Sequence, residues 1–471
     1  KGTDPAGNNN AAATDFTFVY DTTAPTVSSI TFADAALKNG ETSLVTIVFS
    51  EAVTAFANAD LTIVNGAMSA VSSADNGVTW TSTYTPTADL EDDSNVLIVA
   101  NSYTDSAGNA GASGLTSGNY EIDTLKPTAS NIVMSTSNSN SALAKSGDTI
   151  TLTITMSESV TSLVCTIDAE ATNMGGSGTD WTSTLTLSGD ETEQSTVFSC
   201  ASGQDGAGNT MVADTSANSG AVTVDLTAPL VGIGTVAGDG YINGDEAASF
   251  TITGTASGAN GQTVTVTYGG DSETATVSAG EWTMTMCDDE SCSHSAGLSA
   301  VTANVNDAAG NAATQASVNA WYDVTDPTTT ISGIDIGTDT GSSATDFITN
   351  TASTTLIATL STALATGETL EYSLNGGSSW ADDDHNTAGG TAVTTAAVTL
   401  NAGTSSIKFR ISDAAGNTGA VASQAYTLDT TAPTITTVAV AGATEDGYGI
   451  ASTYVVTITP SEDLSAVPTL T

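Results

Sequence analysis

Two short aspartate motifs recur along the chain about every 100 residues, and this repetition constrains the fold more than any other sequence feature. One motif is a linker close to D-x-T-x-P, whose aspartates are spaced by 102, 102, 98 and 106 residues. The other is the turn D-x-A-G-N, which keeps nearly the same period. Two independent markers with one period indicate a tandem repeat. The linker aspartates are Asp21, Asp123, Asp225, Asp323 and Asp429, and the turn aspartates are Asp4, Asp105, Asp205, Asp307 and Asp413.

Each repeat contains about seven short runs in which apolar and polar residues alternate, separated by Gly, Asn, Asp and Ser. Runs such as "SLVTIVFS" and "TITLTITMS" are rich in β-branched residues, and no stretch has the period of an amphipathic helix. About seven strands in 100 residues predict an immunoglobulin-like β-sandwich. The predicted fold class is therefore all-β, a tandem array of Ig-like β-sandwich domains forming an extended rod.

The markers divide the 471 residues into four complete modules and two partial ones. Each linker proline fits a chain that leaves one sandwich in extended form and begins the next. The predicted ranges are 1–23 for the end of a preceding repeat, 24–126 for module 1, 127–228 for module 2, 229–326 for module 3, 327–432 for module 4 and 433–471 for the start of a fifth repeat.

The charge balance excludes several classes of partner. Lys and Arg total 6 against 52 Asp and Glu, a net charge of −46. A chain this acidic repels nucleic acid and anionic membrane surfaces. No apolar run approaches the length of about 20 residues that a membrane span needs. The first residues are polar and already contain a repeat turn, so we expect an internal part of a longer protein, with its export signal, anchor and ligand-binding region elsewhere.

The linker and the turn together resemble the bacterial Ig-like repeats of giant cell-surface adhesins and biofilm-associated proteins. Modules 1 and 2 share an S-E-x-V step at Ser50–Val53 and Ser157–Val160, and "SEDL" at Ser461–Leu464 begins a similar fifth repeat. Module 3 is similar to a second subtype from the same proteins, and module 4 departs most because it lacks the S-E step. The resemblance implies an exported tandem stalk, often dependent on calcium.

Acidic residues gather where the strand order predicts the poles of the sandwiches. Several carboxylates facing one another across a joint repel unless a cation neutralises them, and calcium accepts about six to eight oxygen ligands in loose geometry. We therefore expect Ca²⁺ at the joints. The predicted ligands are Glu41, Glu91, Asp92, Asp93, Asp123, Glu158 and Asp205 between modules 1 and 2; Asp148, Asp190, Glu191, Asp225 and Asp307 between modules 2 and 3; Asp245, Glu246, Asp288, Asp289, Glu290, Asp323 and Asp413 between modules 3 and 4; Asp346, Asp429 and Glu462 between module 4 and the fifth repeat; and Asp21, Glu51 and Asp105 at the front of module 1.

A second interpretation of the turns needs no metal. Asp and Asn begin turns through side-chain to backbone hydrogen bonds, and Gly-Asn tolerates left-handed geometry. On this interpretation D-x-A-G-N is a well-formed turn and nothing more. Turn chemistry alone does not explain an aspartate at every linker, so the combined pattern favours a metal.

The four cysteines predict two disulfides, because they fall in pairs within separate modules of a chain that resembles exported proteins. The pairs are Cys165–Cys200, on neighbouring strands of module 2, and Cys287–Cys292, which bracket an acidic loop of module 3. Buried free thiols are the alternative for the first pair. Two isolated histidines, His294 and His385, occur in polar loops outside any catalytic or zinc-binding motif. We expect no enzyme activity.

Three functions are compatible with the sequence. The favoured one is the calcium-stiffened stalk of an extracellular cell-surface adhesin, which meets its unknown surface ligand through regions outside this sequence. The second is a filament or sheath in which the modules associate laterally. The third, a carbohydrate-binding array, requires exposed aromatic residues in groups, whereas Trp80, Trp181 and Trp282 recur once per module in a strand position typical of core packing.

Overall fold

The computed structural model describes residues 2–287, 294–383, 389–441 and 455–464, together with 466, 467 and 469. Contacts divide the chain into two compact units, Lys1–Thr227 and Ala228–Thr471. The regular structure of the described residues is β except for one 3₁₀ turn, η1 (Asn58–Asp60). No helix in the described part is long and apolar enough to cross a bilayer. The all-β prediction is confirmed.

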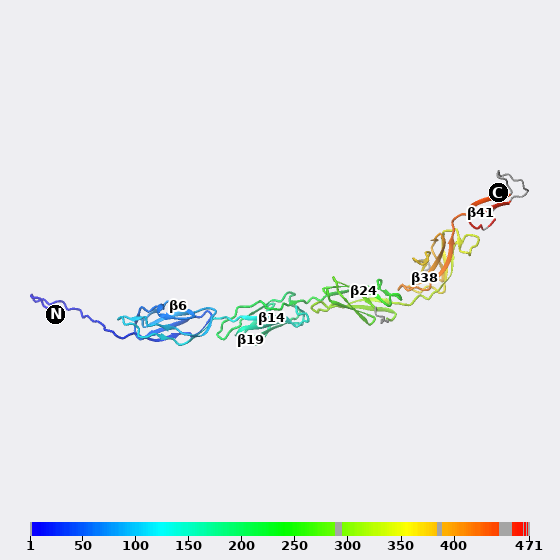
Figure 1. Cartoon of the computed structure of the whole chain (residues 1–471). Helices are drawn as coiled ribbons and strands as arrows, with labels where there is room; N and C mark the ends of the chain where they lie inside the picture. Colours follow the sequence, from blue (N-terminus) through cyan, green and yellow to red (C-terminus); the bar gives the residue numbers. More distant parts are fainter. Residues whose placement is uncertain are drawn as a thin grey trace. The chain divides into compact units, whose positions relative to one another are not determined.

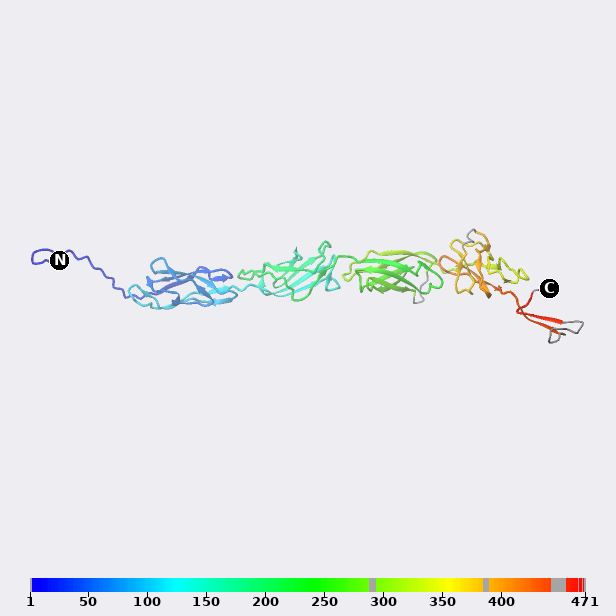
Figure 2. The ribbon, with the colours of Figure 1, turned by 90° about the horizontal axis from the view of Figure 1, so that it is seen from above.

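Buried apolar residues form four separate clusters, one in each of modules 1 to 4. The strands of each module form a separate group in the ribbon (Figure 1). The clusters extend from Ile30 to Ile122, from Ile132 to Val224, from Val236 to Tyr322 and from Ile336 to Leu428. Seen from above, the strands around each cluster again form a bundle of their own (Figure 2). Each module therefore has its own core, as a tandem array of sandwiches requires, while the residue boundaries of the six segments stay a prediction.

Module 1 places its core between the sheet β1-β3-β8-β6, with β7 also paired to β8, and shorter ladders β2-β13-β9, β12-β10-β5 and β11-β4. The strands are β1 (Val27–Phe32), β2 (Ala36–Lys38), β3 (Ser43–Phe49), β4 (Val53–Thr54), β5 (Leu61–Thr62), β6 (Gly66–Met68), β7 (Ser72–Ser73), β8 (Thr79–Pro86), β9 (Glu91–Asn95), β10 (Ile98–Val99), β11 (Thr104–Asp105), β12 (Leu115–Thr116) and β13 (Tyr120–Asp123).

Module 2 completes the first unit with sheets β14-β16-β19 and β18-β17-β20 and the pair β15-β21. Its strands are β14 (Ala129–Thr136), β15 (Leu143–Ala144), β16 (Thr149–Val160), β17 (Val164–Ile167), β18 (Glu170–Ala171), β19 (Asn173–Thr186), β20 (Phe198–Ala201) and β21 (Thr223–Val224).

Module 3, in the second unit, is a sandwich of a three-stranded sheet, β22-β24-β27, and a five-stranded sheet, β23-β29-β28-β25-β26. Its strands are β22 (Leu230–Val236), β23 (Tyr241–Ile242), β24 (Phe250–Ser257), β25 (Thr263–Tyr268), β26 (Asp271–Thr276), β27 (Glu281–Met286), β28 (Gly297–Asn304) and β29 (Ala316–Tyr322).

Module 4 has sheets β30-β33-β36 and β31-β39-β38-β34-β35 and the pair β32-β37, and the hairpin β40-β41 follows it. The strands are β30 (Ile331–Ile336), β31 (Ile348–Thr349), β32 (Ser353–Thr354), β33 (Leu356–Leu360), β34 (Thr369–Ser373), β35 (Ala381–Asp382), β36 (Ala392–Thr394), β37 (Val398–Thr399), β38 (Gly403–Ser412), β39 (Ala422–Leu428), β40 (Ile435–Ala441) and β41 (Val455–Pro460).

A short early strand in every module pairs in parallel with the last strand. β2 pairs with β13, β15 with β21, β23 with β29 and β31 with β39. This ladder fixes the turn after the early strand beside the residue that leaves the module, because Lys38 pairs with Asp123. The last strand ends on the linker aspartate or immediately before it. Each linker aspartate is therefore held by its own module before the next module begins.

The recurring tryptophans pack into the modules. Trp282 is buried, and Trp80 and Trp181 are half-buried against the cores of their modules. Each indole donates a hydrogen bond from Nε1 to a carbonyl: Trp80 to Gly77 at 3.0 Å, Trp181 to Gly178 at 2.9 Å and Trp282 to Thr255 at 3.1 Å. The grouped, exposed aromatics that a carbohydrate-binding array requires are not formed by these three residues.

Candidate metal centres

The D-x-A-G-N turn buries one carboxylate in a fixed orientation. In module 2, Asp205 Oδ1 accepts the amide hydrogens of Gly208 at 2.7 Å and Asn209 at 2.8 Å. Its Oδ2 accepts the side-chain amide of Asn209 at 2.8 Å. Asp105, Asp307 and Asp413 accept hydrogen bonds from the backbone and side-chain amides of Asn109, Asn311 and Asn417 in the same way. The motif is a well-formed turn, and the turn also places a charged group at the pole of the module.

The glutamate of the S-E step is aimed at the linker by the serine before it. Ser157 donates its backbone amide to the Thr128 carbonyl at 2.8 Å, and its Oγ accepts the Thr128 amide at 3.0 Å. Thr128 follows the linker proline directly, so Glu158 is held beside the linker. Ser50 and Thr26 make the same two bonds in module 1.

Asp123, Glu158 and Asp205 come together at the joint between modules 1 and 2. One carboxylate oxygen from each lies within 4.8 Å of the other two. Burial, the Asp205 charge and the Glu91 charge raise the pKa of Asp123. Burial and the charges of Asp205, Asp123 and Glu91 raise the pKa of Glu158. The carboxylates of this triad therefore repel one another, and the hydrogen bond from Asn209 to Asp123 Oδ1 at 3.2 Å offsets this repulsion only in part.

Asp21, Glu51 and Asp105 form a second triad at the front of module 1, with the same 4.8 Å limit between their oxygens. Burial and the charges of Asp21 and Asp105 raise the pKa of Glu51. The pKa of Asp105 is lowered, chiefly by the hydrogen bond from the Asn109 side chain. The hydrogen bonds of the turn thus favour the charged form of Asp105, whereas the charges of Asp21 and Asp105 disfavour the charged form of Glu51.

The donors in both triads suit calcium. Hard cations such as Ca²⁺ prefer carboxylate and carbonyl oxygens and tolerate irregular geometry. Each triad offers three carboxylates, and the raised pKa values of Asp123, Glu158 and Glu51 show that negative charge there is disfavoured without a cation. Calcium held by Asp123, Glu158 and Asp205 would supply positive charge to offset this repulsion.

The other acids predicted at the joint between modules 1 and 2 have separate surroundings. Glu41 closes a turn by accepting the Lys38 amide at 3.2 Å and lies 3.7 Å from Lys38 Nζ. Asp92 accepts the Asn65 side chain at 2.7 Å. Glu91 pairs with Asp123 across the β9–β13 ladder, and Glu91, Asp93 and Asp123 line one cavity of about 490 Å³. Of these predicted ligands, Glu91 is the one whose charge contributes to the raised pKa values of Asp123 and Glu158.

The acids predicted between modules 2 and 3 are held within their own modules. Asp148 accepts the Lys145 amide at 2.8 Å, and Asp190 and Glu191 accept hydrogen bonds from Ser188. Asp307 is 5% exposed inside its turn. Asp225 is half-buried at the end of the first unit. Metal binding by these residues stays a prediction.

In the second unit, Asp323 and Asp413 approach each other through Asn417, whose Nδ2 lies 2.8 Å from the Asp323 carbonyl and 2.8 Å from Asp413 Oδ2. Asp245 is exposed, and Glu246 accepts the Asn243 amide at 3.2 Å. Asp288, Asp289 and Glu290 lie outside the described residues. Among the described residues, no third carboxylate joins Asp323 and Asp413 in a group as close as the two triads.

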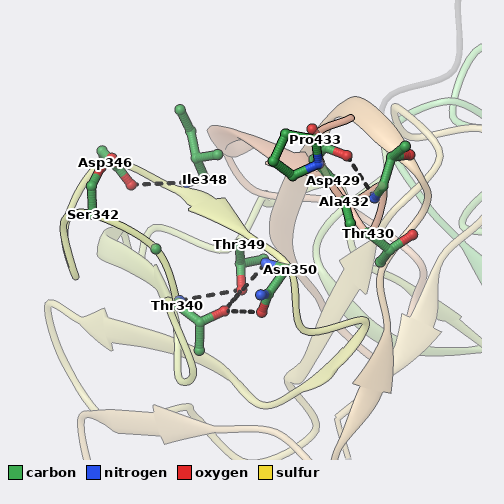
Figure 3. Close-up of a pocket in the computed structure, with 12 residues that line it drawn as sticks. Thr340, Ser342, Asp346, Ile348, Thr349, Asn350, Asp429, Thr430, Ala432 and Pro433 are labelled. Carbon is green, nitrogen blue, oxygen red and sulfur yellow. Dashed lines mark hydrogen bonds between the residues drawn. The ribbon is translucent and has the colours of Figure 1, made fainter. Parts of the chain in front are cut away.

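Asp346 and Asp429 line one cavity of about 430 Å³ at the end of module 4 (Figure 3). Asp346 Oδ1 accepts the Ile348 amide at 3.1 Å, and Asp429 Oδ1 accepts the Thr431 amide at 2.9 Å. Glu462 lines a neighbouring cavity, and its Oε1 is buried without a hydrogen bond from the described part of the chain. These three predicted ligands therefore occupy adjoining cavities.

The disulfide Cys165–Cys200 is present and joins directly opposite residues of β17 and β20. This prediction is confirmed. Cys292 lies outside the described residues, so the predicted pair Cys287–Cys292 stays a prediction, and so does any role for His385. His294 lies in the loop between β27 and β28 as predicted, but its side chain is 3% exposed and packs against Tyr268 and Tyr322.

Sequence reasoning treated the asparagine of D-x-A-G-N only as a turn former. In the structure its side chain also reaches the linker: Asn109 Nδ2 donates to the Asp21 carbonyl at 3.1 Å and Asn209 Nδ2 to the Asp123 carbonyl at 2.9 Å. The signal available in the sequence was the presence of asparagine, rather than any turn-forming residue, at this position of all five motifs.

Comparison with known proteins finds one module similar to a known family. Residues 21–122 match the model of a bacterial Ig-like domain. No curated protein matches the chain. Similar solved structures include a tetra-tandem repeat from the extending region of a large adhesion protein, with 18% identity, a TM-score of 0.26 and coverage of 86% of this chain and 99% of that one.

Two further solved structures have comparable scores. The BSP domain of a biofilm-associated protein has 11% identity, a TM-score of 0.20 and coverage of 88% and 99%. The fibronectin(III)-like modules of CbhA from Clostridium thermocellum have 15% identity, a TM-score of 0.26 and coverage of 41% and 94%. Likeness at this level says nothing about ligand or activity.

Proposed function

Because residues 21–122 are a bacterial Ig-like domain, we propose that this chain is a structural stalk segment of a large extracellular bacterial surface protein. Calcium at the joints stiffens the stalk into a rod, and the stalk projects a distal binding region away from the cell. The proposal assigns no catalysis to the modules. It also places the protein outside the cell, where calcium is plentiful.

The triad Asp123, Glu158 and Asp205 carries the proposal. The linker supplies Asp123, while Glu158 and Asp205 belong to module 2. A cation shared by the three carboxylates ties the linker to the module that follows it. Glu91, from module 1, adds negative charge from the other side of the joint. Neutralising this charge removes the repulsion between the carboxylates, so it favours the arrangement in which they lie together and opposes bending at the joint.

The test compares the full chain in calcium and in a chelator. Calcium is expected to raise the melting temperature and to narrow the distribution of angles between modules 1 and 2, measured by small-angle scattering and by distances between labels on the two modules. Asp123→Asn removes one charge from the triad with little change of shape, so it should greatly reduce both responses.

Glu170→Gln is the matched control, because Glu170 is an exposed carboxylate of β18 outside the triad. It should respond to calcium as the unmodified chain does. A joint that is equally ordered with calcium and with chelator contradicts the proposal. In that case the lateral filament becomes the better explanation of the modules, and it is tested by concentration-dependent association.

A further inference from the structure

The asparagine that ends D-x-A-G-N connects two modules through both atoms of its amide. In the first unit, Asn209 Nδ2 donates to the Asp123 carbonyl, and Asn209 Oδ1 accepts the Asn39 amide at 2.7 Å. In the second unit, Asn417 Nδ2 donates to the Asp323 carbonyl, and Asn417 Oδ1 accepts the Gly244 amide at 2.8 Å. Module 2 is thus bonded to module 1, and module 4 to module 3, by the same side chain.

The backbone amides that donate to the two asparagine Oδ1 atoms come from equivalent turns. Glu41 accepts the Lys38 amide and Glu246 accepts the Asn243 amide, each at 3.2 Å. Asn39 and Gly244 are the next residues in these two turns. Both asparagines that they contact are nearly inaccessible, with Asn209 3% and Asn417 5% exposed. A buried amide that is hydrogen-bonded to several partners resists displacement, because leaving any of these buried partners without a hydrogen bond costs free energy.

The joint between modules 3 and 4 has an additional amide contact. Asn243 Nδ2 donates to the Ala415 carbonyl of the turn at 3.0 Å. At the joint between modules 1 and 2 this position is Lys38, whose Nζ lies 3.4 Å from where a Cβ on Gly208 would stand. At the same position, therefore, the second unit has the neutral amide of Asn243, which donates a hydrogen bond to the D-x-A-G-N turn, and the first unit has the ammonium group of Lys38.

The two joints also differ in charge. Ser361 makes the same two hydrogen bonds to Thr330 that Ser157 makes to Thr128, although Thr330 is the third residue after its linker proline and Thr128 is the first. The residue after Ser361 therefore corresponds to Glu158 in its relation to the serine. That residue is Thr362, and its hydroxyl bonds to Thr329 Oγ1 at 2.8 Å. The described residues of this joint thus contain the linker and turn carboxylates, a neutral side chain in place of the third, and three hydrogen bonds made by the side chains of Asn417 and Asn243.

We propose that the chain contains two kinds of joint. The joint between modules 1 and 2 is a carboxylate joint, which needs calcium to become ordered. The joint between modules 3 and 4 is an amide joint, which Asn417 and Asn243 keep ordered without calcium. The first half rests on the proposed function, whereas the second half rests only on the hydrogen bonds of the second unit. A fall in calcium then loosens one joint and leaves the other in place.

The experiment measures distances across both joints in the full chain. Spin labels on non-natural amino acids leave the native cysteines intact, and exposed strand positions are available at Ala67 and Thr182 for the first joint and at Thr283 and Ser423 for the second. Chelation is expected to broaden the distance distribution across the first joint and to leave the second unchanged. Equal broadening at both joints overturns the inference while preserving the proposed function. No response at the first joint contradicts the proposed function and the carboxylate half of the inference with it, whereas the amide half is judged by the second joint and its variants.

Variants separate the amide contacts from the rest of the joint. Asn417→Ala and Asn243→Ala, which lie in different modules, should each broaden the second distribution with or without calcium. Asn260→Ala is the control, because Asn260 accepts the Ala279 amide within module 3 and takes no part in the joint. A distance within module 4 checks that Asn417→Ala still folds. An unchanged second distribution in both joint variants overturns the amide joint.

A substitution in the opposite direction completes the test. Thr362→Glu introduces a carboxylate at the residue that follows Ser361, as Glu158 follows Ser157. It should convert the second joint to one that broadens in chelator and narrows again when calcium is added. If Thr362→Glu leaves the joint insensitive to calcium, the missing glutamate is not what distinguishes the two joints.

Discussion

At the residue scale, Glu158 is expected to change the sign of its effect with calcium. Glu158→Gln removes a charge that Asp123, Asp205 and Glu91 repel. Without calcium the variant should be more stable than the unmodified chain by about 0.2–1 kcal/mol, the range for partly exposed charge pairs. With calcium it should be less stable, because a ligand is lost. Chemical denaturation in both conditions measures this, and the same sign in both would contradict a metal role for Glu158.

The raised pKa values of Asp123 and Glu158 also fix a pH dependence. The folded joint binds protons more readily than the unfolded chain, so the stability from these groups is fully present below their ordinary pKa values, about 4. It is lost as pH rises through the raised values. In chelator, the unfolding free energy should therefore fall with rising pH more steeply for the unmodified chain than for the double variant Asp123→Asn, Glu158→Gln. Calcium should remove this difference, and a difference that persists in calcium would rule out metal at the triad.

At the scale of elements, the disulfide between β17 and β20 should hold module 2 together independently of metal. It closes a loop with a sequence separation of 35 residues. Replacing Cys165 and Cys200 together by alanine should lower the stability of module 2 by about 2–4 kcal/mol. Hydrogen exchange followed by mass spectrometry can read this in peptides from β17 and β20. Modules 1 and 4, which contain no cysteine, serve as internal controls and should exchange as before.

The elements that could be predicted are those whose signal lies within one strand. The alternation of β3 and β16 and the recurring tryptophans of β8, β19 and β27 indicate sandwich strands directly. The short strand β2 was missed, and β15, β23 and β31 carry no clearer signal, because two or three residues between turns have no period and pair only with a strand far along the chain.

The same limit applies to the site. The triad residues were predicted because their motifs recur, and the absence of the S-E step in module 4 was visible. The two hydrogen bonds from Asn209 Nδ2, to Asp205 and to the Asp123 carbonyl, could not be predicted from the sequence. They depend on how the turn of one module packs against the end of the last strand of the module before it.

At the scale of the whole molecule, the net charge of −46 makes stability depend on salt. Raising monovalent salt from 0.01 M to 1 M shortens the screening length from about 30 Å to about 3 Å. In chelator, this change should raise the melting temperature, because repulsion at the joints and between surfaces is screened. In saturating calcium the increase should be smaller. Calorimetry of the full chain measures both series, and equal increases would show that calcium does not neutralise the joint charges.

The parallel pairing of each early strand with the last strand has a mechanical consequence. Tension applied to the two ends of module 1 draws β2 and β13 in opposite directions along their axes, because the strands run the same way and are pulled from opposite ends. The hydrogen bonds of that ladder then share the load instead of opening one after another. A chain of such modules resists stretching even where its thermal stability is modest, since the pulling direction meets the ladder in shear.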